Sequence, residues 1–343
     1  MPPFRRPDPE LIYDLAKEKN AIDDWYDHRN VPVSNSNNLL IASWNIANLG
    51  VQNRIEKDLK LIGHIISRFD LIAVQEINDN LSNFIKLVKY IGDHFDYIIT
   101  DTAGNNERLG FIYNKKKVNV GRLFAEIAIP KKNHPRYTVV VPYRRGGENR
   151  VEVYYKHEFI PFDRNPFVGN FECKSFNFTI VNTHLYFGAF KNSTTMTERA
   201  KYARRVLEII TLSKWAKKRI KKQTTYDKDI LLIGDMNIPA MDKNDSAYKA
   251  LLKSGLKPLD YFSKTGGSNI LNTKTYDQMA IPTGDIKKKL ADYNVFDFDN
   301  NVFKDKWNEL SSIYTNNNAS KKFNKYIKSY ISDHRPLWME FNL

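Results

Sequence analysis

A chain of 343 residues, 42% of them hydrophobic, has enough apolar material for a large core, and this excludes wholesale disorder. The length allows two ordinary domains or one large α/β unit. Lys and Arg number 53 against 39 Asp and Glu, and the net charge of +14 favours a polyanionic partner, either nucleic acid or an anionic membrane surface. The alternative is that this charge only keeps copies of the protein apart.

Cysteine usage and the first residues bear on location. Cys173 is the only cysteine, so no intrachain disulfide can form, and the composition fits a reducing compartment. Residues 1–7 hold no apolar segment typical of a signal peptide, and no apolar run reaches the length of a membrane span. We therefore expect a soluble, cytoplasmic protein.

Residues 1–38 form an N-terminal arm that is rich in proline and then in charges of both signs. Asp8 and Pro9 are typical of a helix start and predict a helix from residue 9 to about residue 27. Residues 31–38 have the composition of a linker. The arm either packs onto the surface or mediates a contact, and the sequence leaves both open.

The next part of the chain alternates apolar strand patterns with amphipathic helix patterns. The predicted elements are a strand over 39–44, a helix over 53–69, a strand over 71–74, a helix over 81–88 and strands over 97–100 and 109–113. The first strand ends at Asn45 and the second at Gln75 and Glu76.

The middle of the chain is more basic. Residues 115–150 favour β-structure, and the break at 145–148 predicts a hairpin. A strand over 176–183 leads to His184, and a long helix is predicted over 195–222. The cations at its end, 217–222, either complement the helix C-terminus or contact a phosphate backbone.

The apolar run 231–233 predicts a strand buried on both faces, which stops at Gly234. Residues two apart in an extended chain project to the same side, so Asp235 and Asn237 lie together at the C-terminal end of this strand. Ligands of open α/β sheets bind at that edge, and a carboxylate beside an amide suits a phosphate or a metal-bound water. Taken alone, the motif could equally be an ordinary Asx turn.

The last part of the chain holds a predicted helix from Ser246 to Gly255 and a polar stretch that leads to Tyr276 and Asp277. Residues from about 300 to 330 are rich in Asn and Lys and predict an inserted, mobile loop. Residues 331–341 predict a turn followed by a final strand.

Polar groups thus recur where apolar strands stop, at Asn45, Glu76, His184 and Asp235. Buried carboxylates are costly unless they are paired or bound to metal, so this recurrence indicates one site. Glu76 could hold a hard cation such as Mg2+, and Asp333 could join it. Histidines with carboxylate partners could move protons at a phosphate.

Seven short motifs occur in a fixed order from residue 43 onwards. They are Ser43-Trp44-Asn45-Ile46, Val74-Gln75-Glu76-Ile77, Glu107-Arg108-Leu109, Asn182-Thr183-His184-Leu185, Gly234-Asp235-Met236-Asn237, Tyr276-Asp277 and Ser332-Asp333-His334-Arg335-Pro336. In this order they resemble the DNase I-like endonuclease/exonuclease/phosphatase superfamily.

The resemblance implies a single catalytic domain over 39–343 with an α/β fold of the α+β type. The implied architecture is a four-layer sandwich in which two mainly antiparallel sheets pack face to face with helices outside. The implied reaction is hydrolysis of a phosphodiester or a phosphomonoester with a divalent metal.

The resemblance also implies roles for single residues. Glu76 matches the metal ligand, with Asn45 and Asp333 at its periphery. Asp235 matches the residue that orients or deprotonates the attacking water, and Asn237 matches the residue that steadies the phosphate.

The remaining roles fall to two histidines and an arginine. His334 matches the histidine at the scissile phosphate, held by Asp277. His184 matches the second histidine, often assigned as the general acid, and Glu107 matches its supporting carboxylate. Arg164 resembles an arginine that meets substrate phosphate.

Two features depart from the type nuclease of this family. Asn78 stands where that nuclease has an arginine for minor-groove contact, and Cys173 alone cannot form its disulfides. Contact with DNA is therefore expected from other cations. The candidates are residues 115–117, Arg144, Arg145 and the run 217–222.

Together these features predict a Mg2+-dependent, DNase I-like endonuclease that binds and hydrolyses DNA, with Mn2+ or Ca2+ as alternative ions. RNA stays open as a substrate. One alternative is a phosphatase or phospholipase of the same superfamily that acts on an inositol phosphate or a sphingolipid head group. Another is a non-catalytic nucleic-acid-binding protein on the same fold.

Overall fold

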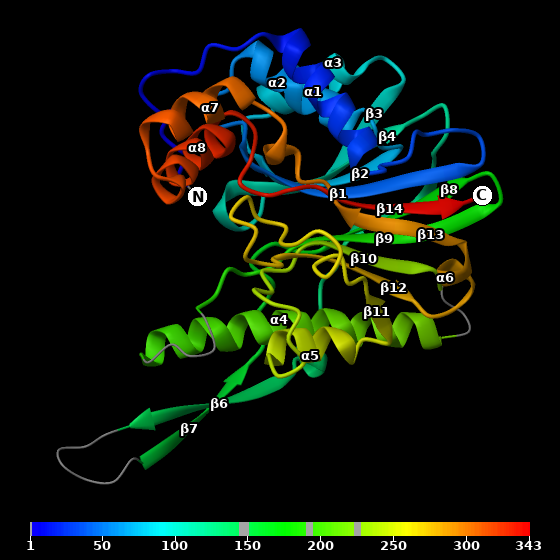
Figure 1. Cartoon of the computed structure of the whole chain (residues 1–343). Helices are drawn as coiled ribbons and strands as arrows, with labels where there is room; N and C mark the ends of the chain where they lie inside the picture. Colours follow the sequence, from blue (N-terminus) through cyan, green and yellow to red (C-terminus); the bar gives the residue numbers. More distant parts are fainter. Residues whose placement is uncertain (1, 144–150, 190–194, 223–227) are drawn as a thin grey trace.

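The computed structural model describes residues 2–143, 151–189, 195–222 and 228–343 (Figure 1). In these residues two six-stranded sheets lie face to face. The first sheet has the order β13 (Leu290–Val295), β14 (Leu337–Asn342), β1 (Asn38–Leu49), β2 (Leu71–Asn78), β4 (Glu107–Asn114) and β3 (Phe95–Ile99). The second has the order β11 (Leu256–Pro258), β12 (Asp277–Pro282), β10 (Ile230–Asp235), β9 (Phe176–His184), β8 (Phe167–Cys173) and β5 (Asn119–Glu126).

Each sheet has one parallel pair at its centre, β1 with β2 and β9 with β10, and all its other pairs are antiparallel. The central strands therefore end at one common edge. Their antiparallel neighbours β12 and β14 begin at that same edge. Residues from six strands can thus meet there.

Helices cover the outer faces of both sheets, so the molecule has four layers (Figure 1). The outer helices of the first sheet are α1 (Leu15–His28), α2 (Glu56–Ile66), α3 (Ser82–Ile91), α7 (Lys304–Ile313) and α8 (Asn316–Tyr330). The second sheet is covered by α4 (Met196–Lys221) and α5 (Ser246–Leu252), and the short α6 (Asp285–Lys289) links β12 to β13. The predicted four-layer sandwich of mainly antiparallel sheets is confirmed.

The core between the sheets follows the two-residue period of the strands. In β1, Leu39 and Ile41 face the other sheet, whereas Leu40 and Ala42 face the helices. In β10, Leu231 and Ile233 face inward in the same way. Continuing this period to the strand ends points the side chains of Asn45 and Asp235 into the space between the sheets.

An amide pair joins the two sheets just behind this edge. Gln75 donates to Asn182 Oδ1 across 2.7 Å, and Asn182 Nδ2 donates to the carbonyls of Val74 and Gly110 at 3.1 and 2.9 Å. Both amides are fully buried. Buried amides in such a network fix the two sheets relative to each other, because each lost partner leaves an unsatisfied group.

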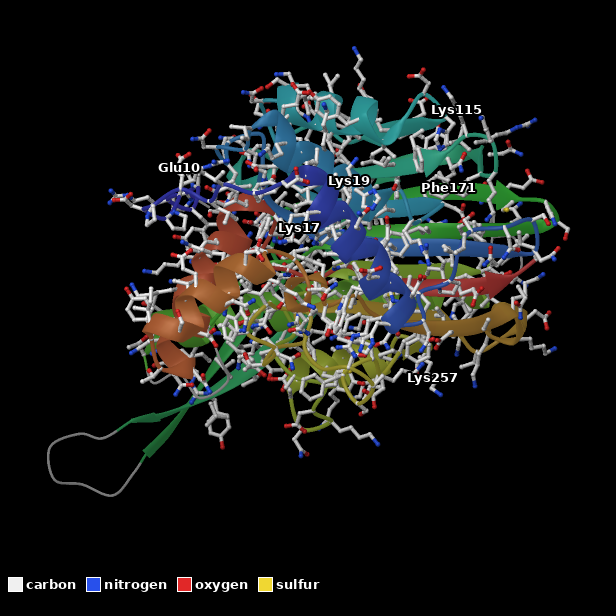
Figure 2. The ribbon with its side chains drawn as sticks, turned by 45° about the horizontal axis from the view of Figure 1, so that its top comes forward. Glu10, Lys17, Lys19, Lys115, Phe171 and Lys257 are labelled. Carbon is white, nitrogen blue, oxygen red and sulfur yellow. The ribbon has the colours of Figure 1, made fainter. Side chains whose placement is uncertain are left out.

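The N-terminal arm packs onto the outer helical layer, and α1 lies along the surface of the molecule (Figure 2). Its helix begins at Leu15 rather than at residue 9, because Asp14 caps it by accepting from the backbone of Lys17. Upstream, Arg6 forms an ion pair with the buried Asp58, and Tyr13 donates to the same carboxylate at 2.9 Å.

The prediction of a loop from about 300 to 330 is wrong, because α7 and α8 occupy most of this segment. Its Asn and Lys residues lie largely on exposed faces, while Ala319, Phe323, Ile327 and Tyr330 form a buried stripe at helical spacing. The many Asn and Lys residues on the exposed faces make the segment resemble a loop and obscure the helical spacing of its apolar residues.

The predicted hairpin is present as an antiparallel ribbon of β6 (Arg136–Tyr143) and β7 (Val151–Glu158), which extends away from the body of the molecule (Figure 1). The turn expected at 145–148 lies outside the described residues. Three short 3-10 helices complete the fold: Gly104–Asn106, Lys131–Asn133 and Phe298–Asn300. Across the ranges that the structure describes, no helix is long and apolar enough to cross a membrane.

The amide pair gives a stability prediction. Replacing Asn182 with Ala removes the partners of Gln75, Val74 and Gly110, and we expect the free energy of unfolding to fall by about 2–4 kcal/mol in urea titrations. Asn119→Ala, on an exposed position of β5, is the control and should cost less than about 0.5 kcal/mol. Equal losses in the two variants would contradict this role for Asn182.

Candidate active site

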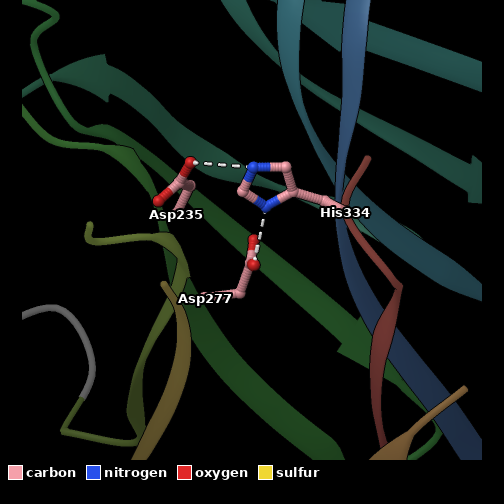
Figure 3. Close-up of side chains that lie close together, drawn as sticks. All are labelled: Asp235, Asp277 and His334. Carbon is pink, nitrogen blue, oxygen red and sulfur yellow. Dashed lines mark hydrogen bonds and ion pairs between the residues drawn. The ribbon is translucent and has the colours of Figure 1, made fainter. Parts of the chain in front are cut away.

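The predicted site residues come together at the common strand edge, and Asp235 lies at their centre. Its Oδ2 is 3.7 Å from His184 Nε2 and 3.9 Å from His334 Nε2, and it accepts a hydrogen bond from Asn45 at 3.1 Å. Figure 3 shows Asp235 and Asp277 on opposite nitrogens of the His334 ring. The carboxylate of Asp235 is therefore shared by two histidines, one at the end of β9 and one in the segment just before β14.

The turn after β10 holds Asp235 in place. Gly234 has a φ of 128°, and a Cβ there would lie 2.1 Å from the carbonyl oxygen of Thr183, so only glycine fits. Asn237, with a φ of 52°, donates its backbone N–H to Asp235 Oδ1 at 2.9 Å and its side chain to the carbonyl of Leu185 at 2.7 Å. An Asx-type turn is thus present, and it orients a carboxylate that faces the site.

Glu76 is brought to the site by an irregularity in β2. It has a φ of 61°, and the pairing of β2 with β4 shifts register between Val74 and Ile77. Such a bulge redirects a side chain that would otherwise point to the helices. Glu76 accepts from the Asn45 side chain at 2.9 Å and from the Asn48 backbone at 2.8 Å. Asn45 therefore bridges Glu76 and Asp235.

His334 and Asp277 form a buried pair, with Nδ1 2.8 Å from Asp277 Oδ2. The main chain around them is held from several sides, since Trp44 donates to the carbonyl of His334 and Tyr261 to that of Asp277. Burial lowers the pKa of the imidazole, but the charge and hydrogen bond of Asp277, with the charge of Asp235, outweigh it. The pKa of His334 lies well above its ordinary value, which favours the protonated ring.

His184 has its own carboxylate partner, because its Nδ1 is 3.1 Å from Glu107 Oε2. Burial raises the pKa of Glu107, but the hydrogen bond and charge of His184 and the charge of Arg164 outweigh it and hold that pKa below its ordinary value. Glu107 is therefore an anion that fixes the orientation of the His184 ring.

Arg164 lies behind His184. It donates to the carbonyls of His184 and Leu185 at 2.9 and 3.1 Å and pairs with Glu107 and Asp163. It is 3% exposed. In this arrangement Arg164 braces the second histidine, and its expected contact with substrate phosphate stays a prediction.

The residues around Glu76 fit a hard divalent cation. Oδ1 of Asn45 and Oδ1 of Asp333 are buried acceptors that receive no hydrogen bond from the described residues. Ser332 joins the two segments by donating to the carbonyl of Asn45 at 2.8 Å. Burial, with the nearby charge of Glu76, raises the pKa of Asp333 above its ordinary value. Two carboxylates and an amide oxygen form an oxygen donor set of the kind that Mg2+ prefers.

A second group has metal-site spacing, because ligand atoms of Asp235, Asp277 and His334 all lie within 4.8 Å of one another (Figure 3). Here, however, both nitrogens of the His334 ring face carboxylates, and Nδ1 is already hydrogen-bonded. A protonated imidazole has no lone pair for a metal.

Comparison with known proteins identifies the fold. No protein-family model and no curated protein sequence matches the chain. Solved structures of endonuclease/exonuclease/phosphatase family proteins do match it. The human Nocturnin catalytic domain with bound sulfate has a TM-score of 0.51 and 12% identity, over 91% of this chain and 96% of that chain.

Two further structures match equally well. The mannosyl-6-phosphatase of Bacteroides thetaiotaomicron has a TM-score of 0.50 and 16% identity, over 89% of this chain and 100% of that one. A humanized D. rerio TDP2 has a TM-score of 0.50 and 12% identity, over 90% and 100%. The chain has the endonuclease/exonuclease/phosphatase fold. The fold that the sequence motifs predicted is thereby confirmed.

Several supporting residues of this endonuclease/exonuclease/phosphatase fold were not predicted as part of the site. Asn48 contributes its backbone N–H to Glu76, Ser332 links two segments, and Glu208 of α4 accepts from the backbone of Tyr186 at 2.7 Å. Asn48 and Ser332 lie next to or within the sequence motifs, so their position could have indicated a role in the site. Glu208 lies in a predicted helix without such a motif, so no sequence pattern indicated its role.

Glu208 gives a pH prediction. Burial raises the pKa of its carboxyl from 4.5 to about 7. The folded state therefore binds more protons than the unfolded state between these two values, and stability falls as the pH rises from 4.5 through about 7. Glu208→Gln removes this titration. The free energy of unfolding of both proteins is measured at pH 5 and at pH 8. Between these two pH values, that of the wild type should fall relative to that of the variant by up to about 3 kcal/mol. A difference that is independent of pH would contradict this assignment.

Proposed function

We propose that the protein is a divalent-metal-dependent phosphodiesterase that hydrolyses DNA as an endonuclease. The observation that carries this proposal is the position of Asp235 between two histidines, each with a carboxylate on its other ring nitrogen. This arrangement offers one anion that can accept a proton and two imidazoles that can contact or protonate phosphate oxygens. A proton acceptor, a group that binds the phosphate and a proton donor can together catalyse the hydrolysis of a phosphoester.

Asp235 is proposed to orient and deprotonate the attacking water. Its Oδ1 accepts from the backbone of Asn237, whereas Oδ2 accepts from Asn45 and faces both histidines, and Oδ2 is proposed to contact the water. His334, whose protonated form Asp277 favours, is proposed to bind the scissile phosphate and offset its developing charge. His184, oriented by Glu107, is proposed to donate a proton to the leaving oxygen.

The cation site is proposed to consist of Glu76, Asn45 and Asp333, with Mg2+ as the ion. When bound there, the cation would offset negative charge on the phosphate oxygens. Asn45 ties this site to the proton-transfer residues, since its side chain donates to both Glu76 and Asp235. A displacement of the cation-site residues is therefore expected to displace Asp235 as well.

Nucleic acid is proposed as the substrate because of the net charge of +14. Residues 115–117, expected as DNA contacts, follow β4 at the edge opposite to the site, where Lys117 pairs with Asp70 at 2.7 Å. Arg144 and Arg145 lie outside the described residues. The run 217–222 is the other expected contact within the described residues. Its cations form no ion pairs with other described residues.

Plasmid cleavage tests the catalytic assignment. With Mg2+, the wild type should nick supercoiled DNA, and a chelator should stop the reaction. Asp235→Ala and His334→Ala should each lower the nicking rate by about 10²–10⁴-fold, because each removes a group that handles a proton or charge at phosphorus. His28→Ala, an exposed histidine on α1, is the matched control and should leave the rate unchanged.

A folded wild type that does not nick DNA but releases phosphate from a small phosphomonoester would replace this proposal with the phosphatase alternative. Binding of DNA without hydrolysis in Mg2+, Mn2+ or Ca2+ would favour the non-catalytic alternative.

The cation site has a test that does not use activity. At an ion concentration about 100 times Kd, bound Mg2+ or Mn2+ should raise the free energy of unfolding of the wild type by about 2.7 kcal/mol. Glu76→Gln should lose most of this increase, whereas Glu172→Gln, on an exposed position of β8, should keep it. The same ion response in both variants would exclude Glu76 as a ligand.

A further inference from the structure

A basic groove runs along the C-terminal half of α4, outside the catalytic site. It has a volume of about 660 Å³ and lies between the helix and the segment 128–135, which connects β5 to β6. Among the residues that the structure describes, its lining includes five cations and no carboxylate. They are Lys132, Lys214, Lys218, Arg219 and Lys222.

Three of the cations form a row. Lys214, Lys218 and Lys222, the last at the C-cap of α4, are spaced four residues apart and so lie on one face of the helix. Like charges at this spacing repel each other. None of the three has an ion pair with another described residue. The helix dipole acts within the last turn, so it accounts for Lys222 and Lys218 but not for Lys214.

The opposite side of the groove adds a further cation. Lys132 lines it from the segment 128–135, and Trp215 lies in the lining with the guanidinium of Arg219 5.5 Å from its ring. Charge is thus present on both sides, with an aromatic ring in the lining. A groove of this kind can follow a phosphate backbone and stack on a base.

The row leads away from the catalytic edge, because Trp215 and Arg219 lie beside Ile230, where β10 begins. Glu208 of α4 accepts from the backbone of Tyr186, two residues after His184. From Glu208, a helix rise of about 1.5 Å per residue places Lys214, Lys218 and Lys222 about 9, 15 and 21 Å further along the axis. The row itself covers about 12 Å, which corresponds to three or four nucleotides at about 3.4 Å each.

We propose that this groove is a second binding site for the phosphate backbone of a nucleic-acid strand, on the outer side of the second sheet and separate from the catalytic site. The proposal rests on the proposed function for the reaction, but the binding itself is independent of hydrolysis. It divides the basic run 217–222 by face: Lys218, Arg219 and Lys222 line the groove, whereas Lys217 lies near Gly255 at the end of α5.

The structure favours nucleic acid over an anionic membrane. The site is a groove, which a strand can enter and a flat bilayer cannot. None of its lining residues is among the exposed large hydrophobic side chains of the described chain, which a membrane-binding surface would need for insertion.

Binding in the presence of a chelator tests the site without hydrolysis. The probe is a fluorescent single-stranded DNA of about 20 nucleotides, and its affinity is measured by anisotropy at about 50 to 200 mM salt. The triple variant Lys214→Gln, Lys218→Gln, Lys222→Gln should bind at least tenfold more weakly. Its slope of log affinity against log salt should be shallower by about 2, which is three phosphate contacts at about 0.7 each.

The control variant removes the same charge elsewhere, with Lys253→Gln, Lys287→Gln and Lys321→Gln at exposed positions of other helices or their ends. It should match the wild type in affinity and slope. Equal affinity and slope in the two triple variants would overturn the groove site. So would a loss of binding to anionic phospholipid vesicles in the groove variant with DNA binding unchanged.

The outcome is separable from that of the proposed function. If the wild type never nicks DNA but the groove variant alone loses DNA binding, the groove site stands and the nuclease proposal fails. If the wild type nicks DNA and both triple variants bind it equally, the reverse holds.

Discussion

The contact between Gln75 and Asn182 is the interaction on which the site depends, because it joins the two sheets at the edge where their central strands end. The inward-facing rows of β1 and β10 are apolar up to Ile41 and Ile233 and then turn polar, at Ser43 and Asn45 in β1 and at Asp235 in β10. Facing sheets bring these ends together only if their relative position is fixed. The buried amides provide this, since sliding one sheet would leave several buried polar groups unsatisfied. The hydrogen bond from Asn45 to Asp235 is then a contact between two rigid sheets rather than between loops.

The second constraint is electrostatic. Besides Glu107, which pairs with His184, four carboxylates gather at this edge, and buried anions are stable only with partners. Two of the four, Asp235 and Asp277, surround the His334 ring and favour its protonated form. The other two, Glu76 and Asp333, lie near each other, and Asp333 has a raised pKa and a buried oxygen without a donor among the described residues. The site thus divides into a half whose charges are balanced by histidine and a half that suits a divalent cation.

Much of this could be predicted from the sequence. Strand ends marked by polar residues identified Asn45, Glu76, His184 and Asp235, since the two-residue period carries a buried face to the end of a strand. Long-range pairings such as Glu107 with His184 came only through the family resemblance, because no local pattern links them. The role of Arg164 as a brace, the helices at 304–330 and the bulge at Glu76 needed coordinates. Each depends on tertiary packing, which overrides composition and local propensity.

The most direct test of the divided site is to locate a bound ion. Crystals grown with Mn2+ can be measured at the manganese absorption edge, where the anomalous signal marks the metal alone. The account predicts a peak within bonding distance of Glu76, beside Asn45 Oδ1 and Asp333 Oδ1, with the His334 to Asp277 hydrogen bond intact. A peak enclosed by Asp235, Asp277 and His334 would contradict it, because the same residues could not then hold a protonated imidazole and transfer the protons assigned to them.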